Sequence, residues 1–218
     1  MTDLTDNRSD RLRVVASHRQ KDLTIILENV HDRHNIGAIL RTCDSVGIHE
    51  IYVIYTDDRL SEDKNTKPGK TSSSGASKWI NVHHFTDVEE CFAEVRKKYH
   101  TIIGTALSDE AKDLYAIDLT QPTALLFGNE SVGLSATARK LADSNFLIPQ
   151  VGFVQSLNIS VACAVSIYEA YRQRNQDSES TPIDQEWTDK IYNRYANIHT
   201  ETRLRKQAHK TMKRKNNL

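Results

Sequence analysis

Three short segments combine glycine with side chains that can bind a ligand or take part in acid–base chemistry. They are residues 29–41, with Asn35 and Arg41; residues 127–134, with Gly128, Asn129 and Glu130; and residues 148–162, with Ser156 and Asn158. Amide, carboxylate and hydroxyl groups hydrogen-bond ribose and amino groups, whereas a guanidinium binds phosphate. Each segment follows an apolar run typical of a strand and opens a stretch typical of a helix. Because α/β folds keep their chemistry in loops at the carboxyl ends of strands, we expect one assembled site.

Each motif alone also has a simpler explanation. Asn35 stands where a helix N-cap would stand, and Arg41, on the polar side of the same helix, is typical of a surface charge. The Gly128 segment could be a turn, and Ser156 or Asn158 could merely cap the next helix. Three such motifs at successive strand ends together favour a functional site.

The elements that would position these motifs alternate between strand and helix. Apolar or β-branched runs predict strands at 23–27, 51–55, 79–83, 101–106, 123–127 and 146–149. Apolar spacing and caps predict helices near 35–46, ended by Gly47; after a capping box of Thr86 and Glu89; from Ser135 to about Asp143; and from Asn158 to about Arg174. This order indicates an α/β fold with a mostly parallel sheet. The long polar stretch 56–78 is expected to be a functional loop.

Composition indicates a cytoplasmic protein of one ordinary domain with short extensions. The 218 residues are 38% hydrophobic and 27% charged, and no apolar run approaches the ~20 residues that span a bilayer. Three cysteines without a Cys-x-x-Cys pair favour reduced thiols, and the polar start does not resemble a signal peptide. The histidines at 31, 34, 83 and 84 lack regular ligand spacing, so we predict no metal site. The sequence lacks a P-loop, which argues against a nucleotide hydrolase.

Basic residues collect at both ends of a chain whose net charge is zero. The candidates for contacts to nucleic-acid phosphates are Arg8, Arg11, Arg13, Arg19, Arg203, Arg205, Lys206 and Lys210. The alternative is a solvated tail. A polar linker at 175–181 precedes a helical segment with an apolar face of Trp187, Ile191, Tyr195 and Ile198. We therefore divide the chain into a basic N-terminal segment 1–21, a domain 22–174 and a helical basic extension 175–218.

The three segments resemble the signature motifs of the SPOUT superfamily of methyltransferases, in its SpoU/TrmH branch. The resemblance covers residues 22–174 and rests on Asn35, Gly37, Arg41, Gly47, Gly128, Asn129, Glu130, Gly133, Pro149, Ser156 and Asn158. It implies a deep C-terminal trefoil knot, a homodimer, and transfer of a methyl group from S-adenosylmethionine to a ribose 2′-hydroxyl of RNA. The short basic start and the helical tail resemble the layout of the tRNA guanosine-18 2′-O-methyltransferases, so tRNA is the expected partner.

The resemblance also implies roles for individual residues. Catalysis would fall to Arg41 together with Asn35, Glu130, Ser156 and Asn158. No metal would be needed, because the positive sulfonium of the cofactor already activates the methyl group. The cofactor would be held by Thr105, Leu107, Gly128, Asn129, Glu130, Gly133, Ile148, Leu157 and Asn158. RNA would be contacted by Arg41 and by the basic residues of both ends.

Two other interpretations stay open at this point. The same chemistry could act on ribosomal RNA or on the wobble ribose of tRNA. A protein of another class, a non-catalytic RNA-binding protein, could also keep the fold. The combination of Asn35, Arg41, Glu130 and Asn158 argues against that class, because RNA binding alone does not require it.

Overall fold

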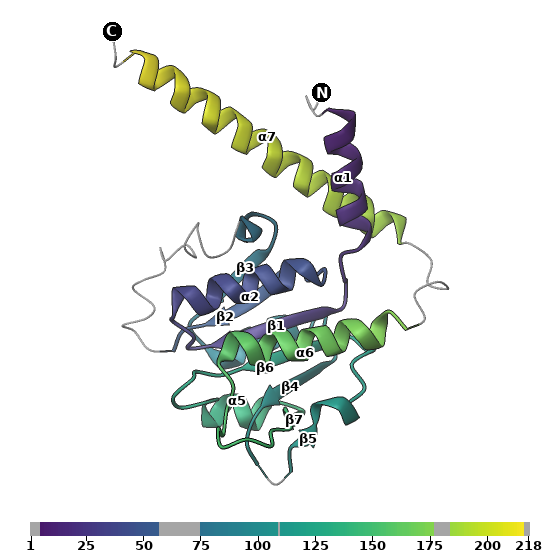
Figure 1. Ribbon diagram of the computed structural model, residues 1–218, viewed down its shortest axis with the longest axis vertical. Helices are drawn as coiled ribbons and strands as arrows, with labels where there is room; N and C mark the ends of the chain where they lie inside the picture. The colour runs from purple at the N-terminus through teal and green to yellow at the C-terminus, as the bar shows by residue number, and fades with distance from the viewer. Residues whose placement is uncertain (1–4, 57–74, 109, 177–183, 216–218) are drawn as a thin grey trace. The chain divides into compact units, whose positions relative to one another are not determined.

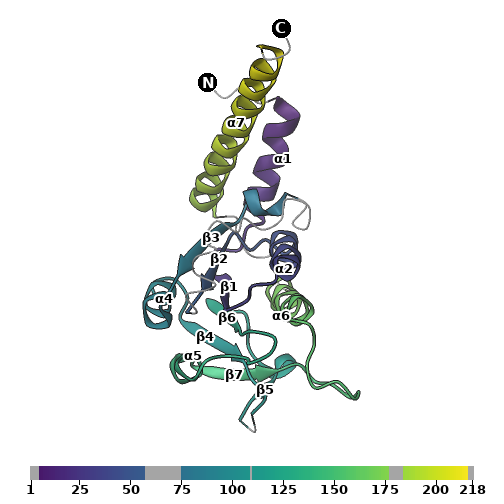
Figure 2. The same cartoon turned by 90° about the vertical axis from the view of Figure 1, so that its left-hand side faces the viewer.

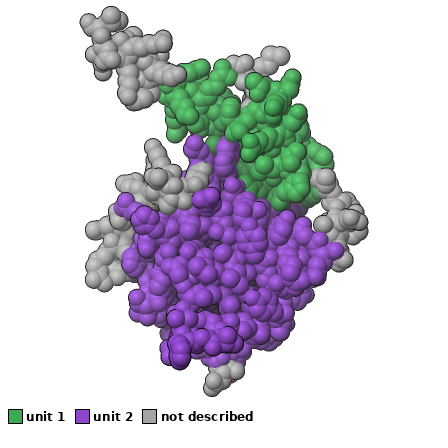
Figure 3. Space-filling model, viewed as in Figure 1, with its two compact units in different colours: residues 1–19, 182–218 green, residues 20–181 purple. Residues whose placement is uncertain are grey.

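The computed structural model describes residues 5–56, 75–108, 110–176 and 184–215. The chain forms two compact units, one of Met1–Arg19 with Pro182–Leu218 and one of Gln20–Thr181 (Figure 3). The larger unit contains the three polar segments, and the smaller one contains the basic residues of both ends. Most of the predicted loop 56–78 and of the predicted linker 175–181 lies outside the described residues.

The larger unit is built on a seven-stranded sheet in which all neighbouring strands run parallel. The order across the sheet is β3-β2-β1-β6-β4-β7-β5 (Figure 1). The strands are β1 Leu23–Glu28, β2 Glu50–Ile54, β3 Asn81–Phe85, β4 Thr101–Thr105, β5 Lys112–Asp113, β6 Thr123–Phe127 and β7 Ser144–Leu147. The predicted α/β fold with a parallel sheet is confirmed.

Helices cover both faces of this sheet. On one face α2 (Arg33–Ser45) packs against α6 (Ile159–Arg174), and on the other lie α4 (Val88–Val95) and α5 (Ala136–Leu141) (Figure 2). Every residue of β1 and β6 is buried between these layers. Strands covered on both faces read as continuous apolar runs, which is why the sequence shows them clearly.

Two predicted helix caps are confirmed and two are wrong. Ser135 accepts the backbone N–H of Ala138, and Asn158 accepts that of Ser160, as predicted. The cap of α2 is Asp32 rather than Asn35, and the cap of α4 is Asp87, which replaces the predicted box starting at Thr86. Asp32 lies three residues before Asn35 and accepts the N–H of His34, and Asp87 directly follows Thr86 and accepts the N–H of Glu90.

Strand boundaries shift where pairing, rather than hydrophobicity, decides them. β3 begins two residues later than the predicted 79–83, because Asn81–Phe85 pairs with β2 along its whole length. β7 begins at Ser144, earlier than the predicted 146–149, because Ser144 pairs with Ile103 of β4. The two-residue strand β5 and the 3₁₀ turns η1 (Ala76–Lys78) and η2 (Leu114–Ala116) have no signal in the sequence.

A buried acidic residue, Glu50, organises the amino-terminal end of the sheet. It is 2% exposed, and its carboxylate accepts hydrogen bonds from Lys98 Nζ at 2.8 Å and Tyr99 Oη at 2.9 Å. Tyr52 Oη and His83 Nε2 bind the same carboxylate at 3.2 and 3.1 Å. Burial raises the pKa of Glu50, but the hydrogen bonds from His83 and Lys98 and the charge of His49 outweigh it, so the pKa lies well below its ordinary value.

The smaller unit is a pair of antiparallel helices, α1 (Asp6–Ser17) and α7 (Gln185–Lys215). Ser9 Oγ lies 2.8 Å from Tyr192 Oη, and Trp187 Nε1 donates to the carbonyl of Arg19 at 2.9 Å. Ile191 and Tyr195 are buried, as their helical spacing predicts. α7 continues past the amino-terminal end of α1, and the basic residues from Arg203 onward lie on this continuation (Figure 1).

Candidate active site

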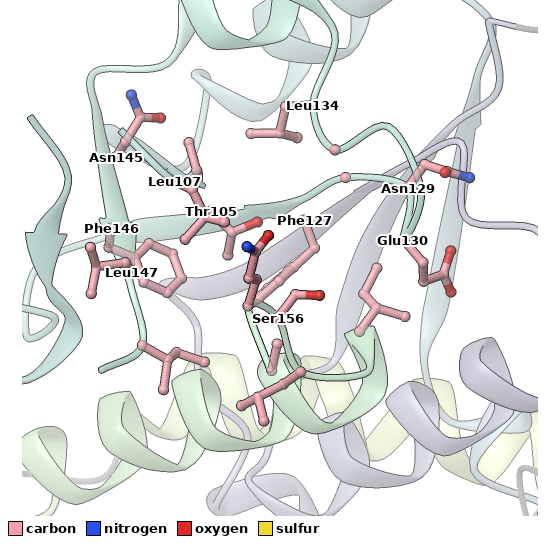
Figure 4. Close-up of a pocket in the computed structure, with 18 of the residues that line it drawn as sticks. Thr105, Leu107, Phe127, Asn129, Glu130, Leu134, Asn145, Phe146, Leu147 and Ser156 are labelled. Atoms are coloured by element: carbon pink, nitrogen blue, oxygen red, sulfur yellow. The ribbon is translucent and has the colours of Figure 1, made fainter. Parts of the chain in front are cut away.

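A cavity of about 660 Å³ opens at the carboxyl ends of β4, β6 and β7 (Figure 4). Its walls come from the loops after these strands, within residues 105–108, 127–134 and 145–162. Apolar side chains alternate with hydroxyl and amide groups in these walls: Leu107, Phe127, Leu134, Phe146, Ile148 and Leu157 face the same space as Thr105, Ser108, Asn129, Ser131 and Ser156. Such a lining suits a ligand with both a flat apolar part and several hydroxyl groups.

The loop after β6 is closed tightly on itself. The N–H of Asn129 donates to the carbonyl of Gly133 at 3.2 Å, and the N–H of Gly133 donates back at 2.8 Å. A Cβ at Gly128 would lie 2.3 Å from the carbonyl carbon of Gly133, so this position has no room for a side chain. Gly133 has a φ of +70°, which favours glycine. The two glycines of this motif are therefore explained by backbone geometry.

Asn129 fixes the start of the loop from both sides. Its Oδ1 accepts the N–H groups of Ser131 and Val132 at 2.8 and 3.2 Å, and its Nδ2 donates to the carbonyl of Asn29 at 3.0 Å. Asn29 follows β1 and has a φ of +55°, a conformation that asparagine tolerates better than most residues. The loop is thus attached to the end of the neighbouring strand.

Three polar side chains from the three sequence segments meet beside the cavity. Asn35 Nδ2 donates to Glu130 Oε1 at 2.7 Å, and Asn158 Nδ2 donates to Asn35 Oδ1 at 3.1 Å. Asn158 also caps α6, so the simpler explanation holds for this residue, and its functional role stays a prediction. Because α2, α6 and the loop after β6 each supply one member, the sheet brings together residues that are 95 and 123 positions apart.

The predicted cofactor residues fall into two groups. Thr105, Leu107, Gly128, Asn129, Glu130, Gly133, Ile148 and Leu157 all line the cavity, whereas Asn158 is outside its described lining and contacts Asn35 instead. Ser156, predicted to be catalytic, also lines the cavity (Figure 4). Arg41 is exposed on α2 and lies outside the described lining. These roles stay predictions.

The predicted RNA-binding residues also differ in their surroundings. Arg13 forms an ion pair with Asp189 at 3.2 Å, and its guanidinium lies 4.2 Å from the ring centre of Tyr192. Arg19 is 5% exposed and lies over the ring of Tyr195. Exposed side chains belong to Arg11, Arg203, Arg205 and Lys206, while Arg8 is half-buried and the side chain of Lys210 is outside the described residues.

Positive charges from α1 and α7 act on one another. Burial lowers the pKa of His199, and the charges of Arg8 and Arg203 lower it further.

In the described ranges, we find no group of three His, Cys, Asp or Glu residues placed to hold a metal ion. Nor does a described helix have the length and apolar character needed to cross a membrane.

The sequence does not predict Glu28 or several residues of the cavity wall as parts of the site. Glu28 ends the otherwise apolar run of β1 and is 1% exposed, and a charged residue inside such a run was the available signal. The cavity is also lined by Arg139 of α5 and by Asn145 and Phe146 of β7. No local pattern in the sequence reveals that β7 lies between β4 and β5 in the sheet.

Comparisons with known proteins agree with this geometry. The model of the SpoU rRNA methylase family matches residues 22–168. A tRNA (guanosine(18)-2′-O)-methyltransferase of Thermus thermophilus is 42% identical over 174 residues, which are 80% of this chain and 87% of the relative. The crystal structure of the Aquifex aeolicus TrmH/SpoU tRNA modifying enzyme is 34% identical, with a TM-score of 0.78 over 88% of this chain and 96% of that one.

A second similar structure was solved with AdoMet bound. The AdoMet-bound rRNA methyltransferase of Sinorhizobium meliloti is 29% identical, with a TM-score of 0.60 over 74% of this chain and 59% of that one. The family match covers the sheet, the cavity and all three members of the Asn35–Glu130–Asn158 network. The chain therefore belongs to the SpoU family of RNA methylases.

Proposed function

We propose that this protein transfers a methyl group from S-adenosylmethionine to a ribose 2′-hydroxyl of tRNA, at guanosine 18 in the D-loop. The observation that carries the proposal is the Asn35–Glu130–Asn158 network at the cavity, because all three segments of the sequence contribute to it. The similarity to the guanosine-18 methyltransferase of Thermus thermophilus supports tRNA over ribosomal RNA as the substrate. A cytoplasmic location is part of the same proposal, since tRNA is the substrate.

The residues present fit S-adenosylmethionine. The cavity volume of about 660 Å³ lies within the roughly 300–1,000 Å³ of small-molecule sites. Leu107, Ile148 and Leu157 offer apolar surface for a purine ring, and Thr105, Ser131 and Asn129 offer hydrogen bonds for a ribose and an amino-acid group. Glu130 and the other residues assigned to the cofactor would hold it in this cavity. Bound there, the cofactor supplies a methyl group already activated by a sulfonium charge.

Arg41 would act on the RNA rather than on the cofactor. A guanidinium is protonated at all working pH values, so it is a poor general base. We propose that it binds the phosphate beside the target ribose and stabilises negative charge that develops on the ribose oxygen. The proton of the hydroxyl then passes to that phosphate or to water. Asn35, Glu130 and Asn158 hold the site in place, and Ser156 positions the substrate.

Arg41→Lys tests this assignment because it keeps the charge and removes the two-pronged hydrogen bond. We expect kcat/KM to fall by about 100-fold. Arg33→Lys, an exposed change at the start of the same helix, is the matched control and should leave the rate close to that of the wild type. Near-full activity of Arg41→Lys would contradict the assignment.

We also propose a homodimer, in which Arg41 of one subunit serves the cavity of the other. Two observations support it: the exposed position of Arg41, and apolar side chains left in solvent along the loop before α6 and on α6 itself. These side chains are Val151, Phe153, Val154, Val161, Tyr168 and Tyr171. Sedimentation of the wild type should give the mass of a dimer, and Phe153→Asp should give a monomer without activity. A fully active monomer would contradict the proposal.

The trefoil knot of the family belongs to the same proposal. β6 lies between β1 and β4, and β7 lies between β4 and β5, so late strands enter the sheet between earlier ones. That order permits a threaded chain, which few proteins have.

RNA contacts outside the cavity are assigned to the smaller unit. We propose that Arg8, Arg11, Arg203, Arg205, Lys206 and Lys210 meet phosphates, because the five whose side chains are described are all exposed or half-buried. Arg13 and Arg19 would instead join α1 to α7 through Asp189, Tyr192 and Tyr195.

The test of the function is transfer of labelled methyl groups from S-adenosylmethionine to unmodified tRNA transcripts, with fragments of 23S ribosomal RNA as the comparison. Label in tRNA and not in the ribosomal fragments is expected. The reverse pattern would keep the reaction and replace the substrate. Tight binding of tRNA without any labelled product would favour the non-catalytic RNA-binding alternative.

A further inference from the structure

Glu28 is a buried carboxylate that the proposed mechanism does not use. It is the last residue of β1 and is 1% exposed. Its Oε2 accepts the backbone N–H of Ser135 at 2.9 Å, and within the described chain its Oε1 has no hydrogen-bond partner. Burial of a carboxylate with one neutral partner costs free energy, so stability alone does not account for a glutamate at this position.

The contact with Ser135 fixes one end of a loop that lines the cavity. Residues 128–134 form that lining, and Ser135 follows them as the N-cap of α5. The other end of the loop is held by the next residue of the chain, Asn29, whose carbonyl accepts Asn129 Nδ2 at 3.0 Å. Glu28 and Asn29 therefore attach both ends of one loop to the end of one strand.

This loop has little freedom to adjust between its two attachments. Gly128 and Gly133 are packed so closely that a Cβ on Gly128 would lie 2.3 Å from the Gly133 carbonyl carbon. The side chain of Glu130, in the middle of the loop, is also held in place, since its carboxylate accepts a hydrogen bond from Asn35 at 2.7 Å. A shift of Ser135 would therefore move the wall formed by residues 130–134.

We infer that Glu28 is a positioning residue of the cofactor cavity, acting through the N–H of Ser135 on the loop 128–134. The inference rests on the proposed function, because it assigns S-adenosylmethionine to the cavity. Glu28 itself is outside the described lining of the cavity, so its effect on the cofactor is indirect. What matters is an acceptor at the reach of a glutamate side chain.

The experiment is calorimetric titration of the full-length protein with S-adenosylhomocysteine. Glu28→Ala removes the acceptor and should weaken binding by about tenfold. Glu28→Gln keeps an acceptor oxygen at the same reach and should bind close to the wild type. Glu28→Asp keeps the charge but is one methylene shorter, and should resemble Glu28→Ala. In steady-state assays, the KM for the cofactor should rise in Glu28→Ala while the KM for tRNA stays unchanged.

Glu50→Gln is the matched control, because Glu50 is a buried carboxylate on the neighbouring strand β2, at the amino-terminal end of the sheet. It should lower the thermal midpoint and leave affinity for S-adenosylhomocysteine unchanged. Equal affinity of all three Glu28 variants and the wild type would overturn the inference, as would Asp binding well and Gln binding poorly. A wild-type protein that does not bind S-adenosylhomocysteine would instead overturn the proposed function.

Discussion

Asn35 uses both ends of its amide, accepting a hydrogen bond from Asn158 and donating one to Glu130. The residue lies in the first turn of α2, where its type suggests a cap, yet Asp32 performs that task. The Asp32 side chain accepts the N–H of His34, so the cap does not use the side chain of Asn35, which is available to the site. At this scale, the site depends on amides that join loops rather than on a single reactive group.

The first prediction separates the cap from the network. Asp32→Ala should lower the free energy of unfolding by about 1 kcal/mol, because it removes the acceptor for the N–H of His34. Asn35→Ala should instead lower kcat/KM by about 100-fold, because the orientation of Glu130 and Asn158 is lost. Chemical denaturation and methyl-transfer rates measured on both variants check this. Equal losses of stability in the two would contradict the separation.

The second prediction concerns the closed loop after β6. Gly128→Ala places a Cβ 2.3 Å from the backbone of Gly133, so the loop must open and the protein should lose about 1–3 kcal/mol of stability. Gly152→Ala is the control, because nothing lies within 4 Å of its added Cβ. Thermal unfolding and affinity for S-adenosylhomocysteine should both fall in the first variant and change little in the second. Wild-type affinity in Gly128→Ala would show that the loop tolerates a side chain.

At the scale of helices and strands, the sequence predicts those elements whose buried residues form a regular apolar pattern. The sequence predicts β1, β6, α2 and α6 because their apolar runs and spacings are regular, and it predicts the meeting of Asn35, Glu130 and Asn158 because strand ends share one edge. It misses β5, because two exposed residues carry no pattern and the pairing with β7 creates the strand. It misses the role of Glu28 because that role depends on Ser135, 107 positions away.

The third prediction concerns Glu50, which lies at the amino-terminal end of the sheet. Hydrogen bonds from His83 and Lys98 hold the pKa of Glu50 below its ordinary value of 4.5, so Glu50 stabilises the fold above that pH and the stabilisation declines as the pH falls below it. Glu50→Gln should cost about 3 kcal/mol at neutral pH and make stability less sensitive to acid. Unfolding measured from neutral to acidic pH checks this, with Glu89→Gln, an exposed change on α4, as the control. Identical acid profiles of wild type and Glu50→Gln would contradict the assignment.

At the scale of the whole molecule, the cavity and the basic chain ends belong to different compact units. The unit of residues 20–181 contains the cavity and matches the family, whereas the unit of α1 and α7 contains the basic residues of both chain ends. A net charge of zero conceals this division, because acidic residues elsewhere balance the ends. Binding of RNA through phosphates should then be sensitive to salt even though the protein is neutral.

The fourth prediction sorts the basic residues by their salt dependence. Arg205 is exposed and forms a surface ion pair with Glu201 at 3.7 Å, so Arg205→Gln should reduce the slope of log affinity for tRNA against log salt by about 0.7–0.9. Arg13→Gln should leave the slope unchanged and lower thermal stability, because Arg13 joins α1 to Asp189 and Tyr192. Filter binding over a range of salt checks both. A smaller slope in Arg13→Gln would place that residue on the RNA.

The most direct test of ribose 2′-O-methylation is to locate the methyl group that the protein adds to tRNA. tRNA incubated with the protein and S-adenosylmethionine is digested with nucleases, and the fragments are weighed by mass spectrometry. We expect one added methyl on the ribose of guanosine 18, and none on a transcript with 2′-deoxyguanosine at that position. A methyl group on a base, or a product from the deoxy transcript, would contradict ribose 2′-O-methylation as the reaction of this site.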